Sequence, residues 1–177
     1  MTKYLEVAHQ GRNEWWRYLI SLPVILAVWF IVGSIPVVLL MAYVSMDGDP
    51  GTGFSATGFT GIPVTLEFIF TMSSFIPFLV GTLLAVRFIH ARSLKTLVTG
   101  EVHIRWERIF AGAGAWLVIA ALISTVESLL YPGRYVLTFQ PAALLIFAVI
   151  ALILIPIQTS AEEIFFRGYL LQWMGLR

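Results

Sequence analysis

Two adjacent glutamates and one arginine near the end of the chain are the residues whose types and spacing could do chemistry. Glu162 and Glu163 directly follow the uncharged run Tyr135–Ala161. Arg167 comes four residues after Glu163. Charged groups at membrane depth are costly, so they persist mainly where they pair with one another or serve a site. A carboxylate held in such a place can act as a general base that activates water for hydrolysis.

Helical spacing predicts different roles for the two glutamates. Successive helix residues are rotated by about 100°, so Glu162 and Glu163 point in different directions. Glu163 and Arg167 lie at i and i+4, which is the geometry of a Glu–Arg ion pair. A carboxylate without a matched cation, in a cavity of low dielectric, suits a general base. The spacing therefore predicts Glu162 as the base and the Glu163–Arg167 pair as its support.

A proline upstream of the glutamates predicts a cavity beside them. Pro156 lies six residues before Glu162 and frees the carbonyl of Leu152 from its helical hydrogen bond, so a kink there could open a polar space. The residues expected to line it are Gln158, Thr159 and Ser160. The alternative is that the three charged residues only snorkel to water at a helix end.

The composition indicates an integral membrane protein. Of the 177 residues, 59% are hydrophobic and 12% are charged, and the mean hydropathy is +0.88. A soluble domain carries about 25% charged residues. The chain has no cysteine, which excludes disulfides, thiolate metal sites and a cysteine nucleophile. No basic arm indicates a nucleic-acid partner, so the expected surroundings are the lipid bilayer.

Long uncharged runs predict the fold class and position the glutamates. A membrane span needs about 20 apolar residues. The predicted spans are Tyr18–Met46, Phe68–Val86, Ile109–Val126 and a fourth that opens at Gln140 and Pro141. The sequence therefore predicts an all-α, polytopic membrane protein with about four transmembrane helices. The fourth helix carries the glutamates near the inner leaflet.

The distribution of positive charge predicts the orientation. The N-terminal segment carries three Lys and Arg residues, the connection Arg87–Arg108 carries five and the tail two. The loop after the first span carries none, and the loop after the third span carries Arg134 alone. Positive charge is enriched in cytoplasmic loops. Both termini are therefore predicted to be cytoplasmic, and the membrane is expected to be the cytoplasmic membrane of a bacterium or archaeon.

The connections between the spans suggest no second site. The loop Asp47–Pro63 is rich in Gly, Ser and Thr and is predicted to be flexible. It is not a calcium loop, because Gly58 stands where the bidentate Glu of the twelfth position belongs. For residues 93–106, an interfacial helix over Ser93–Val98 and a short strand-like segment over 101–106 are both left open. The three histidines are predicted to be surface or interfacial residues rather than metal ligands: His9, His90 and His103.

The ten residues Ala161–Leu170, AEEIFFRGYL, resemble the first motif of the CPBP intramembrane proteases. This family includes the CAAX prenyl endopeptidases of the Rce type and bacterial Abi-domain, lysostaphin-resistance-like proteins. The Glu-Glu-x-x-x-Arg core, the preceding Ala and the following Gly-Tyr-Leu all match. The resemblance implies that Glu162 activates the hydrolytic water and that Glu163 and Arg167 support it. It leaves a divalent metal such as zinc and a metal-free glutamate mechanism equally open.

The resemblance also implies a domain division and a substrate class. Residues 1–134 would form an N-terminal region of three spans, and residues 135–177 the start of the protease domain. The substrate would be a peptide or prenylated protein, cut near the cytoplasmic leaflet. The family's later motifs, Phe-x-x-x-His and His-x-x-x-Asn or Asp, do not occur in this sequence. The chain is therefore expected to correspond to the N-terminal part of a family member and to be inactive alone. The alternative is a non-catalytic membrane module in self-immunity or complex assembly.

Overall fold

The computed structural model describes residues 11–55, 58–98, 105–134 and 140–175. It is 78% helical with almost no strand, which confirms the predicted all-α class. Four helical stretches in the described part are long and apolar enough to cross a membrane: Trp15–Met46, Val64–Ile89, Trp106–Leu130 and Pro141–Met174. The chain divides into two compact units, one of Met1–Gly100 with Leu145–Arg177 and one of Glu101–Leu144.

The first span consists of two α-helices with a π-helical segment between them. α2 (Trp15–Ala27) continues through η2 (Val28–Val32), and α3 (Ile35–Met46) follows. Gly33 separates the two parts, and a Cβ there would lie 2.2 Å from the carbonyl oxygen of Trp29 and 2.8 Å from that of Ser74. Only glycine therefore allows the second span to approach the first so closely at this point.

A short β-hairpin joins the first two spans. β1 (Gly53–Ser55) and β2 (Gly58–Thr60) are antiparallel, with Gly53 opposite Thr60. Phe54 and Phe59 face each other across the strands, with ring centroids 5.3 Å apart. Such aromatic cross-strand pairs stabilise hairpins. The prediction that this loop is merely flexible was therefore wrong for these residues.

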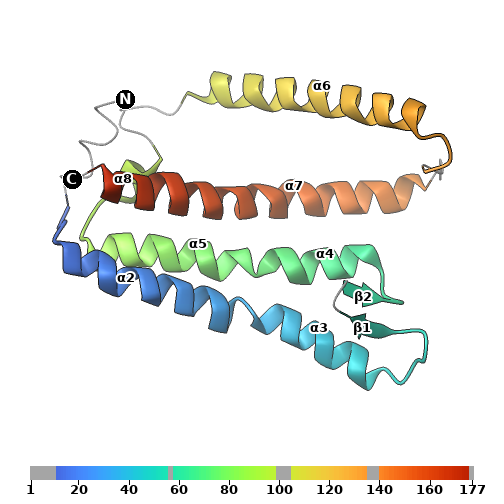
Figure 1. Cartoon of the computed structure of the whole chain (residues 1–177), viewed down its shortest axis with the longest axis horizontal. Coiled ribbons are helices and arrows are strands. Elements are labelled where there is room, and N and C mark those ends of the chain that lie inside the picture. Colours follow the sequence, from blue (N-terminus) through green and yellow to red (C-terminus); the bar gives the residue numbers. More distant parts are fainter. Residues whose placement is uncertain (1–10, 56–57, 99–104, 135–139, 176–177) are drawn as a thin grey trace. The chain divides into compact units, whose positions relative to one another are not determined.

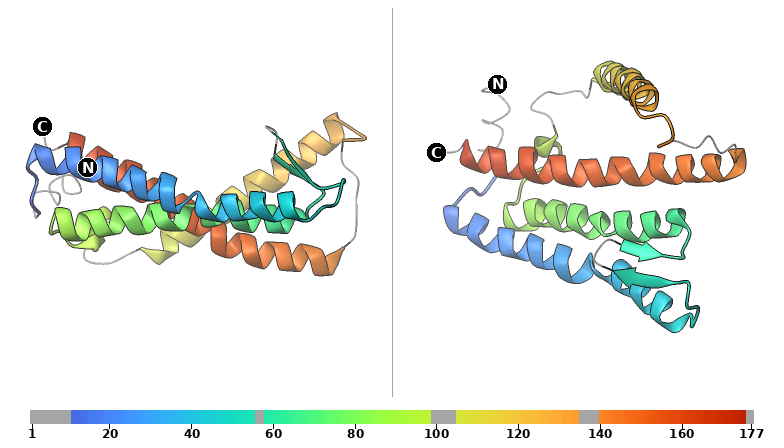
Figure 2. Two further views of the ribbon diagram at one scale, coloured as in Figure 1. Left: turned by 90° about the horizontal axis from the view of Figure 1, so that it is seen from below. Right: turned by 45° about the vertical axis from the view of Figure 1, so that its right-hand side comes forward.

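The second span and the end of the fourth span complete the first unit. The second span contains α4 (Val64–Ser73), α5 (Phe75–Leu84) and the π-helical η3 (Ala85–Ile89). The fourth contains α7 (Pro141–Glu163), the π-helical η5 (Ile164–Leu170) and α8 (Leu171–Met174). Figures 1 and 2 show α2 beside α5 and α3 beside α4, in agreement with their contacts.

The core of the first unit lies where α2, α5 and η5 meet. Trp29 stacks on Phe78 at 4.4 Å between ring centroids, and Phe78 meets Phe165 at 4.9 Å. Ile25 and Ala161 are fully buried in the same cluster. Buried aromatic rings of this kind contribute most to the packing energy of a core. The helix that carries the glutamates is thus held by its neighbours along one face.

Within residues 93–98 lies a short 3₁₀-helix, η4 (Leu94–Leu97), in which Thr96 and Leu97 are buried. The helical alternative is therefore correct for this segment. The strand-like alternation falls largely on residues 99–104, which lie outside the described ones. In the second unit, α6 (Trp106–Leu130) is a single uninterrupted helix of 25 residues, with none of them buried within the chain.

Candidate active site

The ion pair predicted from spacing is present at the end of the fourth span. Glu163 is the last residue of α7, and Arg167 lies one turn later in η5. Their closest oxygen and nitrogen atoms are 2.5 Å apart, and both side chains are more than half exposed within the chain. Charge-assisted pairs of this length are strong when they are shielded from water. The negative charge of Glu163 is thereby balanced by the positive charge of Arg167, one turn later along the same helical stretch.

Glu162 has a different partner. Its carboxylate accepts a hydrogen bond of 2.7 Å from the side-chain amide of Gln158, one turn earlier on α7. Glu162 is half-buried, between buried Ala161 and exposed Glu163. A neutral amide orients a carboxylate without cancelling its charge. Glu162 therefore differs from Glu163 in the way that the spacing predicted.

The polar residues before Glu162 only partly match the predicted lining of a cavity. Gln158 contacts Glu162, as described, whereas the Thr159 hydroxyl donates back to the carbonyl of Ile155 at 2.9 Å. Ser160 is exposed. Pro156 lies inside α7, which runs as one helix from Pro141 to Glu163. Of the predicted lining, Gln158 is the residue brought to the glutamate.

The residues that follow the glutamates form a π-helix rather than an α-helix. η5 spans Ile164–Leu170, and the amide of Leu171 donates to the carbonyl of Phe166, five residues back. π-Helical turns are rare and are frequently found at functional sites. The wider turn directs Phe165 and Tyr169 into the core while Arg167 stays on the open side.

Gly168 allows this π-helical segment to touch η4. A Cβ at this position would lie 2.8 Å from the backbone oxygen of Leu97 and 3.2 Å from its Cβ. Contacts of that length require backbone movement, because the nearest atom belongs to the main chain. The glycine of the motif is therefore explained by close packing between the fourth span and the connection after the second.

A buried hydrogen-bond network ties Tyr169 to the first two spans. The Tyr169 hydroxyl forms a short hydrogen bond with the hydroxyl of Ser21. Nε2 of His90 lies 3.2 Å from the Ser21 oxygen and 3.4 Å from the Tyr169 oxygen. His90 Nδ1 lies 3.1 Å from the carbonyl oxygen of Arg12. Because a carbonyl can only accept, Nδ1 carries the proton and Nε2 of the neutral ring accepts.

His90 is therefore not the surface or interfacial residue that the sequence predicted. It is 1% exposed, and its ring packs against Tyr18 at 4.3 Å between centroids. Burial lowers the pKa of His90, the bond to the Arg12 carbonyl opposes this shift, and the nearby Arg92 guanidinium adds to it. The ring is buried because all of its polar atoms find partners in the fold. His9 and His103 lie outside the described residues.

A second buried network follows one turn further along the same helix. Arg92 donates to the Thr96 hydroxyl at 2.7 Å and to the side-chain oxygen of Gln172. The Gln172 amide donates to the backbone oxygen of Thr96 at 2.9 Å. All three side chains are buried. This network was not predicted from the sequence, although a lone glutamine among apolar residues, three after Tyr169, could have indicated it.

The described residues do not assemble a complete set of metal ligands. They contain no group of three or more His, Cys, Asp or Glu side chains close enough to hold an ion. Glu163 is engaged by Arg167, and Glu162 faces elsewhere. A catalytic zinc site needs three protein ligands. Within the described residues, Glu162 is thus a carboxylate oriented by an amide, beside a second carboxylate that is paired with an arginine.

Comparison with known proteins supplies one bacterial relative. No protein-family model matches the chain, and no solved structure matches it significantly. An "Uncharacterized protein YyaK" of Bacillus subtilis (strain 168) is 29% identical over 167 residues, which cover 94% of this chain. The match covers 55% of YyaK, so the chain spans about half the length of the curated relative that it matches. The chain is thus similar to a longer bacterial protein, and the structure adds four helices suited to a membrane.

Proposed function

We propose that Glu162 is the general base of an intramembrane endopeptidase, and that the protein lies in the cytoplasmic membrane of a bacterium. The observation that carries the proposal is the unequal state of the two glutamates. Glu163 is bound to Arg167 at 2.5 Å, whereas Glu162 is oriented by the amide of Gln158. A carboxylate that is oriented by a neutral amide beside an apolar span can take a proton from water.

In the proposed reaction, Glu162 removes a proton from water as the oxygen attacks the carbonyl carbon of a peptide bond. The protonated Glu162 then gives that proton to the leaving amine when the carbon–nitrogen bond breaks. The negative charge on the carbonyl oxygen requires donors of its own. The CPBP resemblance assigns assisting histidines to motifs that these 177 residues do not contain. We therefore expect hydrolysis only where a longer protein or a second chain supplies them.

A fusion protein tests this proposal. Residues 1–175 are joined to the part of YyaK that lies outside the match, and the fusion is placed in liposomes with CAAX-type and bacteriocin-leader peptides. We expect cleavage, and we expect Glu162→Gln to lower kcat at least about a hundredfold. The matched control is Glu107→Gln, at the start of α6, which should leave kcat unchanged. A folded fusion that cleaves equally well with Glu162→Gln would contradict the proposal.

A non-catalytic membrane module is the second candidate, and a specific observation favours it. Gly168 and Tyr169, two residues of the matching motif, are accounted for by packing against Leu97 and by the bond to Ser21. Part of the motif can therefore serve assembly without any chemistry. In that case, a cellular phenotype such as immunity should survive Glu162→Gln but fail when Gly168 is enlarged.

A further inference from the structure

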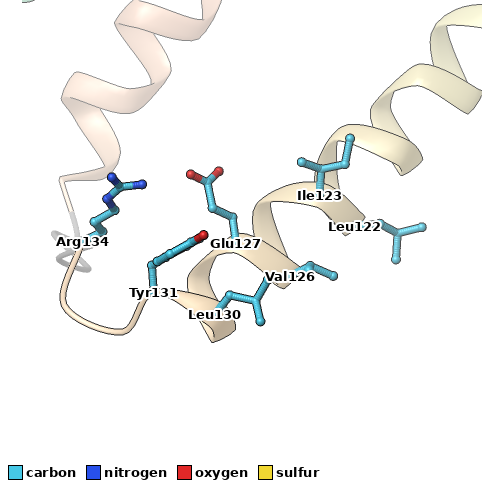
Figure 3. A pocket seen from close by; sticks show the side chains of 7 residues that line it. All are labelled: Leu122, Ile123, Val126, Glu127, Leu130, Tyr131 and Arg134. Atoms are coloured by element: carbon cyan, nitrogen blue, oxygen red, sulfur yellow. The ribbon is translucent and has the colours of Figure 1, made fainter.

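A pocket lies at the C-terminal end of α6, entirely within the unit Glu101–Leu144 (Figure 3). It has a volume of about 530 Å³. One part of its lining is apolar and the other part is charged or aromatic. The apolar wall consists of Leu122, Ile123, Val126 and Leu130, and the polar end of Glu127, Tyr131 and Arg134.

The apolar wall is suited to an acyl chain. Leu122, Val126 and Leu130 recur every four residues and therefore form one stripe along the helix. Each is more than half exposed within the chain. α6 is long and apolar enough to span the membrane, so this stripe faces hydrocarbon unless another helix covers it.

The polar end carries an anion and a cation that are not paired with each other. The guanidinium carbon of Arg134 lies 5.0 Å from the centroid of the Tyr131 ring. Among the residues that the structure describes, neither the Glu127 carboxylate nor the Arg134 guanidinium takes part in an ion pair. Figure 3 shows both charged groups directed to the same side of the loop, with the Tyr131 ring beside them.

We infer that this pocket binds phosphatidylethanolamine. Its phosphate pairs with Arg134, its primary ammonium pairs with Glu127, and one acyl chain lies along the stripe that ends at Leu130. Tyr131 stands at the level of the headgroups, where aromatic residues concentrate. A phosphatidylglycerol headgroup has no cation for Glu127, and the quaternary ammonium of phosphatidylcholine has no N–H to donate. Of these three headgroups, ethanolamine is the one that matches both charges with charge-assisted hydrogen bonds.

Retention of lipids tests the inference. The 177-residue chain is placed in nanodiscs of equal parts phosphatidylethanolamine, phosphatidylglycerol and phosphatidylcholine, and the lipids that stay bound on release are counted by native mass spectrometry. We expect about fivefold enrichment of phosphatidylethanolamine over each of the other lipids. Glu127→Gln should abolish its advantage over phosphatidylglycerol, and Glu127→Lys should reverse it. Arg134→Gln should lower the retention of both lipids.

Glu107→Gln, at the opposite end of α6, is the matched control and should retain the wild-type pattern. Helix content measured by circular dichroism shows whether each variant is folded. Equal retention of the three lipids by the wild-type chain would overturn the inference. So would an enrichment of phosphatidylethanolamine that Glu127→Gln and Glu127→Lys both leave unchanged.

Discussion

The two faces of the helix that ends the fourth span differ in almost every property. One face, with Phe165, Tyr169 and Gln172, is buried in the core and in two hydrogen-bond networks. The other face carries the ion pair of Glu163 with Arg167, and both of these side chains are more than half exposed within the chain. Neighbouring residues of a single motif thus have different roles, because some pack in the core and others lie on the surface.

One face of this helix holds it in the fold, and the other face carries the charged groups that could take part in a reaction. The packed face fixes its rotation through contacts with the first and second spans, and this rotation decides where Glu162 points. Rigid elements position reacting groups more accurately than loops do. Substitutions on the packed face should therefore change stability first, and substitutions on the open face should change activity first.

Enlarging Gly168 should give the largest loss of stability. In Gly168→Ala, the new Cβ meets the backbone oxygen of Leu97 at 2.8 Å, so the variant should lose about 1–3 kcal/mol. The measurement is thermal unfolding of the purified chain in detergent. Gly114→Ala, in α6, meets nothing within 4 Å and is the control. An unfolding temperature for Gly168→Ala equal to that of the control would contradict the close contact.

Removing the Tyr169 hydroxyl should cost less. Tyr169→Phe keeps the ring in the core but leaves Ser21 and His90 with fewer partners, so the free energy of unfolding should fall by about 1–2 kcal/mol. Denaturant-induced unfolding in mixed micelles measures the change. Tyr43→Phe, an exposed tyrosine on α3, should be neutral. If both variants unfold alike, the buried network does not hold the motif helix.

Lowering the pH should reduce the stability of the folded chain through the buried side chain of His90. Because burial lowers its pKa, the unfolded chain binds a proton more readily than the folded chain below about pH 6.5. Stability should therefore be complete above that pH and should fall as the pH drops towards 5, by at most about 1.4 kcal/mol per pH unit. His90→Gln should flatten the pH dependence of the unfolding temperature, and an unchanged pH dependence in this variant would contradict the prediction.

Breaking the open ion pair should have the smallest effect on stability. Arg167→Gln removes an exposed pair, which is worth about 0.3–0.5 kcal/mol at i,i+4. A double-mutant cycle with Glu163→Gln measures the coupling directly. The pair of Glu14 and Arg17, at the start of α2, provides a contrast, because the Arg17 side chain is only 14% exposed. A coupling of several kcal/mol would show that the open face is covered in the membrane.

The features that could be predicted from the sequence are those that depend on neighbouring residues. The four spans follow from composition and length, and the pair of Glu163 with Arg167 follows from helical spacing. Both require no knowledge of the rest of the fold. The assignment of Glu162 as a base stays a prediction, although its hydrogen bond to Gln158 is consistent with it.

The features that the sequence did not reveal depend on residues far apart along the chain. His90 meets Ser21 and Tyr169 across 69 and 79 positions, and Arg92 meets Gln172 across 80. A polar side chain next to an arginine-rich connection is predicted to be exposed, because a single sequence does not show which distant residues become its partners. The hairpin at 53–60 was missed because its glycines and threonines resemble those of a flexible loop.

The most direct test of the central claim compares one residue from each face in the YyaK fusion. Glu162→Gln and Tyr169→Phe are measured for both kcat and unfolding temperature under the same conditions. The account predicts that Glu162→Gln loses at least about a hundredfold in kcat without a change in unfolding temperature. Tyr169→Phe should lower the unfolding temperature and keep most of kcat. A Glu162→Gln fusion that unfolds and cleaves like the wild type would contradict the claim.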